Sequence, residues 1–385
     1  MSAVRDSLLF TSAFRTASAE VLSVCPIAKI RQLNNNLKEL AVRTDAQHDD
    51  NGKSSEPTVR EVIHTPSTNQ HYVPQFLLRN FASGRNKQIY VFEKLSQKTF
   101  RTSVRNVAAE SGFYDYQVDG EVLSVDPALQ DLENVTKDII SKIIRGRSLR
   151  EIDDRTRKNL AVFAATQLFR TEAHRKRWSD VNTKLRQTII AMGGDPEKVE
   201  GFGPISEEDL RVQMISTLPS RAVEGAAYIL EKSWMLLGTS SQKPFCTSDN
   251  PITMSNTLNQ NSHIGTLGLA VPGIEIYFPL SKTLCLGFFC PTIEELIRKS
   301  QKRASSPGNP GANWCMAFDG LAPLEMEHDN VTYLNSLQVI NAERYVFLGD
   351  SDFSLVSKML QNHPELKDGP RFQVNHPSVS PKEIP

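Results

Sequence analysis

The sequence has no long apolar run and no net charge, and each absence narrows the range of functions. No stretch approaches the roughly 18–20 consecutive apolar residues that span a bilayer. The longest candidates, such as residues 284–290, have the length of a core strand. The 44 Lys and Arg residues balance 44 Asp and Glu residues. A globally basic nucleic-acid coat and a disordered polyelectrolyte both depend on a large net charge and are therefore disfavoured. We expect no membrane association.

Paired cysteines and common cofactor signatures are also missing. The five cysteines are scattered and include no Cys-x-x-Cys pair, which fits reduced thiols and predicts a cytoplasmic protein. The chain has no Gly-x-Gly-x-x-Gly after a predicted strand, no Gly-x-x-x-x-Gly-Lys-[Ser/Thr] and no His-Glu-x-x-His. These absences remove the dinucleotide-binding, P-loop and zincin interpretations.

What the sequence does contain is a folded body between two polar ends. The 39% hydrophobic content is typical of a globular chain. Residues 43–70 are rich in Asp, Asn, Ser, Pro and Thr, which predicts a linker, and residues 363–385 carry five prolines, which predicts a disordered tail. We therefore predict an N-terminal extension and linker over 1–68, a folded domain over 69–350, and a terminal helix with a Pro-rich tail over 351–385.

Hydrophobic periodicity predicts three successive blocks of structure. The first block is mixed, with helices at 75–82 and 126–146 and strands at 88–93 and 113–116. The second is helical, with segments at 148–193 and 206–232, the latter interrupted near Pro219. The third has strands at 234–237, 244–247, 274–278, 284–289 and 344–348, with helices beginning at 292 and 329. This order predicts an α+β fold, a single mixed domain in which long helices pack on a mostly antiparallel sheet.

The first candidate site residues lie around the short helix at 75–82. His71 precedes its N-terminus and could act as a general acid or base or contact a ligand, and Arg79 could clamp a phosphate or a carboxylate. The alternative is that His71 caps the turn and Arg79 forms a structural ion pair.

The long helical segment carries polar residues on its apolar stripe. Gln167, Thr171 and His174 interrupt this stripe, and Arg170 lies at its edge. These side chains could line an internal polar site, or the backbone of adjoining segments could satisfy them.

The same segment is locally basic. Residues 145–186 contain twelve Lys and Arg against five Asp and Glu. The segment could follow the phosphates of a nucleic acid, or be an ordinary solvated surface that the acidic stretch 195–209 neutralises.

The sequence Thr-Ser-Asp-Asn-Pro at 247–251 ends a predicted strand. Asp249 could be a base, an orienting carboxylate or a metal ligand. The same five residues are also typical of a tight turn, because Asp and Asn bond their own backbone and Pro fixes the exit.

Several of these motifs, in this order, resemble one family. They are Asn69 to Ala82 (NQHYVPQFLLRNFA), Tyr90-Val-Phe92, Ala108-Ala-Glu with Phe113-Tyr-Asp115, Gln167-x-x-Arg170, Thr247 to Pro251 and Phe278-Pro-Leu-Ser281. Together they resemble the family of domains of unknown function numbered 4238 over about residues 69–350. The resemblance implies no reaction, but it adds Asn80 and Asp115 as site residues beside His71, Arg79, Gln167, Arg170 and Asp249.

The sequence therefore predicts a polar anion-binding site assembled from the His71 segment, the Gln167/Arg170 helix and the Asp249 loop. As an enzyme, the protein would be a hydrolase of a phosphate-bearing substrate such as nucleic acid, with His71 and Asp249 catalytic and Arg79 and Arg170 holding the anion. The alternative is a non-catalytic module for ligand sensing or protein interaction. The sequence leaves metal, cofactor and oligomeric state open.

Overall fold

A computed structural model describes residues 69–84, 86–118, 121–199, 202–259, 267–303 and 311–369. The predicted N-terminal extension and residues 370–385 of the predicted tail lie outside the described residues, so the predicted division of the chain stays a prediction. Residues 364–368, which the sequence assigns to the disordered tail, form a 3-10 helix. None of the described helices combines the length and the apolar composition needed to cross a membrane.

Nine α-helices and three short 3-10 helices are described. The α-helices are α3 (Gln75–Arg79), α4 (Asp126–Gly146), α5 (Asp154–Phe169), α6 (Glu172–Ala191), α7 (Glu207–Leu230), α8 (Pro291–Arg303), α9 (Gly311–Phe318), α10 (His328–Asn341) and α11 (Ser354–Asn362). The 3-10 helices are η1 (Val104–Asn106), η2 (Pro196–Lys198) and η3 (Pro364–Asp368).

The described strands form two larger sheets and two short ribbons. A five-stranded sheet has the order β12 (Leu324–Glu325), β7 (Ser233–Gly238), β11 (Leu284–Phe289), β10 (Glu275–Ser281) and β9 (Thr253–Ser255). A four-stranded sheet has the order β3 (Lys98–Ser103), β2 (Gln88–Glu93), β13 (Tyr345–Leu348) and β8 (Thr247–Ser248). The ribbons pair β1 (Gln70–His71) with β4 (Ala109–Glu110), and β5 (Asp115–Val118) with β6 (Glu121–Ser124). Only the β12–β7 pair is parallel.

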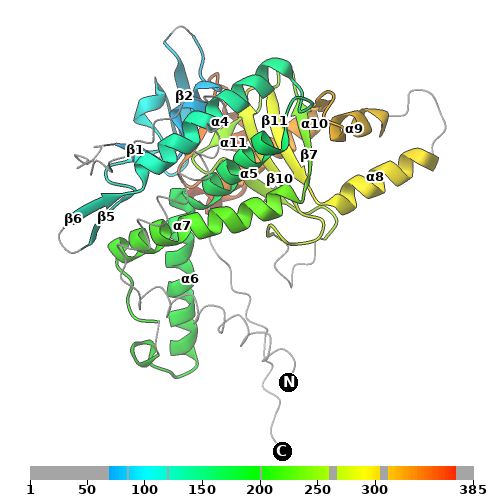
Figure 1. Ribbon diagram of the computed structural model, residues 1–385. Helices are drawn as coiled ribbons and strands as arrows, with labels where there is room; N and C mark the ends of the chain where they lie inside the picture. Colours follow the sequence, from blue (N-terminus) through cyan, green and yellow to red (C-terminus); the bar gives the residue numbers. More distant parts are fainter. Residues whose placement is uncertain are drawn as a thin grey trace, which may run out of the picture.

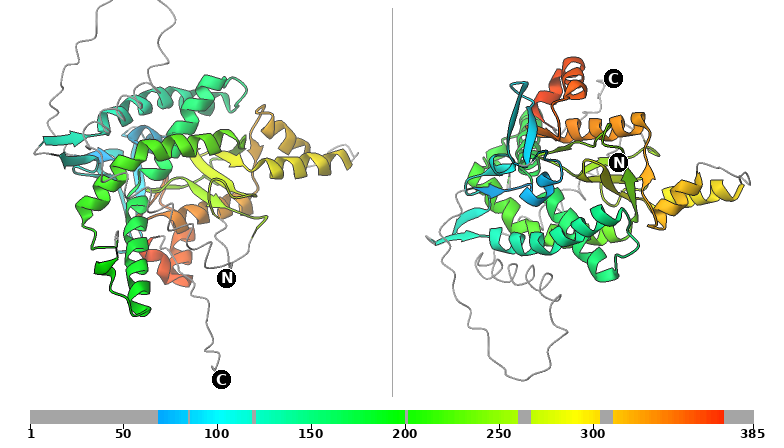
Figure 2. Two further views of the ribbon diagram at one scale, coloured as in Figure 1. Left: turned by 60° about the horizontal axis from the view of Figure 1, so that its bottom comes forward. Right: turned by 90° about the horizontal axis from the view of Figure 1, so that it is seen from above.

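The sheets lie between two layers of helices, which confirms the predicted α+β class. Helices α4, α5 and α7 pack on one side (Figures 1 and 2), where their apolar residues share one core with the inward faces of β10 and β11. On the other side, α9 and α10 cover the five-stranded sheet and α11 covers the four-stranded sheet. The predicted block of long helices therefore does cover a mostly antiparallel sheet.

The long helical segment is divided in two, where the sequence predicts one helix over 148–193. Helix α5 begins after Asp153, whose side chain accepts from Thr156 N and caps the helix, and it ends at Phe169. Thr171 then caps α6, because its side chain accepts from His174 N. This second cap lets the chain change direction, and α6 projects away from the sheets (Figure 1).

The predicted break near Pro219 is wrong. Helix α7 runs without interruption from Glu207 to Leu230 with Pro219 inside it and buried. A proline removes one hydrogen bond of the helix ladder, and the packing of α7 on α5 around this point offsets that loss. Ser206 and Asp209 form a capping box at its start.

Candidate functional site

The three segments that the sequence assigns to one site do meet. The Tyr72 carbonyl, next to His71, accepts a hydrogen bond of 2.9 Å from Gln167 Nε2. Thr171 Oγ1, at the junction of α5 and α6, donates to Asn250 Oδ1 at 3.1 Å. Neighbours of the predicted residues thus join the His71 segment, the α5 end and the Asp249 loop.

Asp249 lies in the interior and is fully engaged with backbone. Its Oδ1 accepts from Glu343 N at 2.9 Å, and its Oδ2 accepts from Arg344 N at 2.7 Å and Tyr345 N at 2.8 Å. Burial raises the pKa of Asp249 to about 7, against the opposing effect of these three N–H groups. The carboxylate therefore fixes the turn between α10 and β13, and this geometry leaves it little capacity to bind a metal or a substrate.

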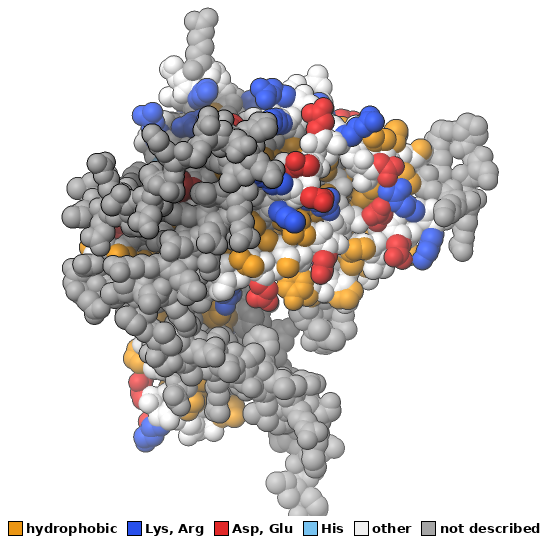
Figure 3. All heavy atoms as spheres, viewed as in Figure 1, with side chains coloured by type: hydrophobic (Ala, Val, Ile, Leu, Met, Phe, Trp, Pro, Cys, Tyr) orange, Lys and Arg blue, Asp and Glu red, His pale blue; other side chains and the backbone are white. Residues whose placement is uncertain are grey.

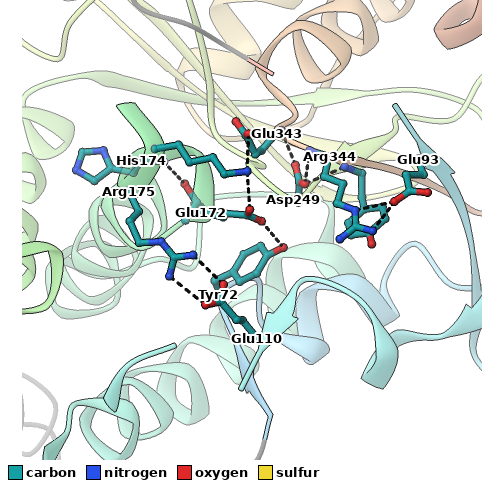
Figure 4. A network of polar contacts seen from close by, with 12 residues as sticks. Tyr72, Glu93, Glu110, Glu172, His174, Arg175, Asp249, Glu343 and Arg344 are labelled. Atoms are coloured by element: carbon teal, nitrogen blue, oxygen red, sulfur yellow. Dashed lines mark hydrogen bonds and ion pairs between the residues drawn. The ribbon is translucent and has the colours of Figure 1, made fainter. Parts of the chain in front are cut away.

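Around this turn lies a cluster of polar and charged side chains, which we call the polar junction: Tyr72, Glu172, Lys176, Asp249 and Glu343. Figure 4 shows Tyr72, Glu172, Asp249 and Glu343 of this cluster. Lys176 Nζ lies 2.8 Å from a Glu172 carboxylate oxygen and 3.0 Å from one of Glu343. The Tyr72 hydroxyl donates to the other oxygen of Glu172 at 3.4 Å. The Glu343 side chain is only 3% exposed, whereas that of Lys176 is 43% exposed. The junction therefore ties the start of α6 to the turn before β13.

Further ion pairs flank the polar junction. Arg175 pairs with Glu110 at 2.8 Å, and its guanidinium lies over the ring of Phe113. Arg344 donates to Glu93 at 2.7 Å. These pairs connect α6 to β4 and the β13 turn to β2, so they extend the same set of contacts between elements.

Gln167 and Arg170 form a second buried group of polar side chains. Arg170 donates from Nε and Nη2 to Gln167 Oε1, and its Nη1 lies 2.8 Å from Glu133 Oε1 on α4. The Arg170 side chain is 1% exposed. Burial raises the pKa of Glu133, although the guanidinium of Arg170 opposes this shift. Side chains of α4 and α5 satisfy the Arg170 guanidinium, and the Tyr72 carbonyl accepts from Gln167.

The two residues that the family resemblance added also bond within the fold. Asp115 Oδ1 accepts from Gln70 Nε2 at 2.6 Å, and Gln70 in turn accepts from Tyr114 N. Asn80 Nδ2 donates to the Leu280 carbonyl at 2.9 Å. Both contacts join segments that are far apart in the sequence.

His71, on β1, and Arg79, on α3, lie near η1. The His71 Nε2 atom is buried and has no hydrogen-bond partner among the described residues. Burial lowers the pKa of His71, and the charges of Arg79 and Arg170 lower it further, while the backbone of Val104 and Arg105 opposes the shift. The imidazole is therefore neutral at pH 7.

The Arg79 side chain lies at the surface. Its guanidinium donates to Gln75 within the same helix at 2.8 Å. No carboxylate of the described residues lies within ion-pair distance of Arg79. The structural ion pair that the sequence offered as an alternative is thus not seen in the described part of the chain.

Most cations of the basic 145–186 segment have partners. Seven of the twelve bond to carboxylates, carbonyls or amide oxygens: Arg147, Arg157, Arg170, Arg175, Lys176, Arg177 and Arg186. Among the described residues of the acidic 195–209 stretch, only Glu197 pairs with this segment, through Arg186. The local charge excess is therefore largely neutralised, mainly by residues distant in sequence.

A second group of cations lacks carboxylate partners. Arg79, Lys87 and Arg105 are exposed and form no ion pair with any described residue. Helix α3 packs on η1, and Gln88, next to Lys87, pairs with Ser103 just before η1. We call these three side chains the arginine face. Figure 3 shows Lys and Arg side chains gathered over the end of the molecule that carries β2.

Acidic residues are scarce around the arginine face. Within residues 69–109 the only acid is Glu93, at the opposite end of β2, where Arg344 binds it. The loop that carries Asp350 and Asp352 lies close to Ser83, because Ser83 Oγ donates to the Gly349 carbonyl. Neither Asp350 nor Asp352 forms an ion pair with Arg79, Lys87 or Arg105. The face therefore keeps its positive charge.

Sequence reasoning missed Tyr72, Glu172, Lys176 and Glu343 as members of a polar cluster. The spacing of Glu172 and Lys176, four residues apart on a helix, signals an ion pair. Nothing local indicates Glu343, because its contact with Lys176 spans 167 residues. No group of three His, Cys, Asp or Glu side chains in the described ranges is arranged to hold a metal ion.

Comparison with family models finds one match. A model described as a protein of unknown function (DUF4238) matches residues 69–352, which is 284 of the 385 residues. Comparisons with curated proteins and with solved structures find no match. The matched range contains the polar junction and the arginine face.

Proposed function

The chain belongs to the DUF4238 family of proteins of unknown function, and from its charge distribution we propose that it binds a phosphate-bearing ligand at the arginine face. The observation that carries this proposal is the contrast in pairing. Five cations of the 145–186 segment pair with carboxylates, whereas Arg79, Lys87 and Arg105 are exposed without an ion pair among the described residues. Unpaired guanidinium groups are suited to phosphate, which they bind through paired N–H donors.

His71 has a supporting part in this proposal. Its ring lies beside the backbone of Arg105 and within the field of Arg79, and its buried Nε2 has no described partner. An anion held at the arginine face would offset the repulsion that the charge of Arg79 exerts on an imidazolium. Ligand binding should therefore raise the pKa of His71 towards its ordinary value.

The contacts favour binding without hydrolysis. A hydrolase would use Asp249 as its carboxylate, but both oxygens of Asp249 accept backbone N–H groups. Arg170, the other proposed anion ligand, is buried against Glu133 and Gln167. We therefore propose a ligand-sensing module, and a cytoplasmic location in keeping with the four described cysteines, none of which forms a disulfide.

The test is titration of the full chain with ATP and with a fluorescein-labelled single-stranded oligonucleotide. We expect Arg79→Ala/Arg105→Ala to weaken binding at least about tenfold, with an unchanged melting temperature, because both side chains are exposed. The matched control is Arg155→Ala/Lys158→Ala, which removes two exposed cations of the 145–186 segment. Loss of binding in the control alone would move the site to that segment and contradict the proposal.

Incubation of the parent protein with the same probes tests the absence of hydrolysis. We expect no release of phosphate and no shortening of the oligonucleotide. Turnover that Arg79→Ala/Arg105→Ala abolishes would replace the sensing module with a hydrolase at the same face.

A further inference from the structure

Strand β3 is an exposed sheet edge. It pairs along its whole length with β2 and, within the described ranges, with no other strand. Its side chains are exposed on both faces from Lys98 to Arg101. The opposite edge of the same sheet, β8, is completely buried at Thr247 and Ser248. One row of N–H and C=O groups of β3 therefore faces solvent, as in any edge strand.

The side chains of this edge are cationic and partly apolar. Lys98 and Arg101 lie on opposite faces of the strand, and the strand itself contains no acid. Phe100, between them, is 40% exposed. The carboxylate nearest to Lys98 is its cross-strand partner Glu93, which already binds Arg344 and Ser96.

We propose that the β3 edge binds an acidic peptide segment in extended conformation, which adds a fifth strand to this sheet. The free backbone groups of β3 would supply the ladder, as in other complexes formed by strand addition. Carboxylates on alternating faces of the peptide would reach Lys98 and Arg101, and an apolar side chain would cover Phe100. Charge complementarity thus specifies the partner.

Two other occupants fit this edge less well. A second copy of the chain, pairing β3 with β3, would bring four cations together without a carboxylate from either strand. A nucleic acid would satisfy the cations, but its phosphates only accept hydrogen bonds, so the outward carbonyls of β3 would stay unpaired. An acidic peptide matches the charge and the backbone groups together.

This inference does not rest on the proposed phosphate site, because it uses other side chains. Arg79, Lys87 and Arg105 form the arginine face, whereas Lys98, Phe100 and Arg101 form the edge. Variants of the two surfaces can therefore fail separately.

The experiment measures fluorescence anisotropy of the full chain with a labelled peptide of about eight residues, half Glu and half Thr. A second peptide has the same sequence with every backbone amide N-methylated, which removes its donors and keeps its charge. We expect the parent protein to bind the first peptide and to lose at least about tenfold affinity for the second. We also expect Lys98→Glu/Arg101→Glu to abolish binding, and Arg155→Glu/Lys158→Glu to preserve it.

Amide hydrogen exchange supplies a readout that does not depend on the variants. On peptide binding, every second amide of β3 should gain protection, because the remaining amides already bond to β2. Equal binding of the methylated peptide, or no new protection in β3, would overturn strand addition. Binding of the oligonucleotide by the parent chain that Lys98→Glu/Arg101→Glu abolishes and Arg79→Ala/Arg105→Ala preserves would assign the edge to nucleic acid instead. Dimerisation of the parent chain that this variant disrupts would assign it to a second copy.

Discussion

The polar junction and the arginine face contain similar side chains in opposite surroundings. In the junction, Lys176 lies between two carboxylates, and both carboxylate oxygens of Asp249 accept hydrogen bonds from backbone N–H groups. On the arginine face, Arg79 and Arg105 are exposed and have no carboxylate partner among the described residues. Buried polar groups that are fully bonded stabilise one arrangement of the chain, whereas unpaired surface charges remain available to a ligand. The comparison therefore separates residues that hold the fold from residues that can bind.

The largest expected effect is on the junction side, from Asp249→Ala. This change would leave the N–H groups of residues 343–345 without their acceptor in the interior. Each buried donor that loses its partner costs about 1–3 kcal/mol, and we expect a loss of roughly 3 kcal/mol in the free energy of unfolding, measured in urea.

Asp249→Asn is the matched control for this change. Its single amide oxygen can replace one carboxylate oxygen, so it should lose clearly less stability than Asp249→Ala. Equal stability of the parent and Asp249→Ala would contradict a fold-holding role and reopen the catalytic one.

A second effect concerns His174, which lies at the start of α6. Burial lowers the pKa of His174 to about 3, and the charges of Arg221 and Arg177 act in the same direction. Because the folded pKa lies below the unfolded one, this contribution to stability is present above pH 6.5 and is lost as the pH falls. Between pH 7 and pH 5 we expect a loss of about 2 kcal/mol.

The titration of Asp249 changes stability with pH in the opposite direction to that of His174. It must therefore be eliminated before the effect of His174 can be measured. Its folded pKa of about 7 exceeds its unfolded value, so its contribution is largest at low pH and is lost as the pH rises through 7. Urea unfolding should therefore be compared in Asp249→Asn with and without His174→Gln. If both proteins lose the same stability between pH 7 and pH 5, His174 is not the group responsible.

The smallest expected effect is from Lys176→Met. The substitution keeps much of the aliphatic stem and removes the ammonium group that Glu172 and Glu343 share. Since the Lys176 side chain is 43% exposed, solvent screens the pair, and we expect a loss of only about 1 kcal/mol. Lys184→Met on the same helix is the control, because Lys184 forms no ion pair with a described residue. A larger loss in the free energy of unfolding for Lys184→Met than for Lys176→Met would show that the ion pairs of the junction do not stabilise α6.

Local patterns in the sequence predict the elements of this fold better than the contacts between them. The strand over 284–289 follows from a short apolar run between turn residues and is seen in the structure, where α7 also begins with a capping box at Ser206. The sequence does not predict the division between α5 and α6, because Thr171 lies on a helical stripe; in the structure Thr171 caps α6 and also donates to Asn250. Contacts between distant segments therefore decide whether Thr171 continues one long helix or caps a second one.

The same limit applies to the site. The sequence identified Asp249 as a polar residue at a strand end, but its partners are backbone groups 94 to 96 residues away. The composition of the 145–186 segment also does not show that Glu110, Glu133 and Glu325 pair with three of its arginines from other elements. Pairing of charges is a property of the folded chain and not of composition.

The most direct test measures both unfolding and oligonucleotide binding for two double variants. One removes the arginine face (Arg79→Ala/Arg105→Ala), and the other neutralises the junction (Glu172→Gln/Lys176→Met). We expect the first to lose binding at least about tenfold with unchanged stability, and the second to lose about 1 kcal/mol of stability with unchanged affinity. Loss of binding in the junction variant, with full binding in the arginine-face variant, would contradict the division of roles between the two regions.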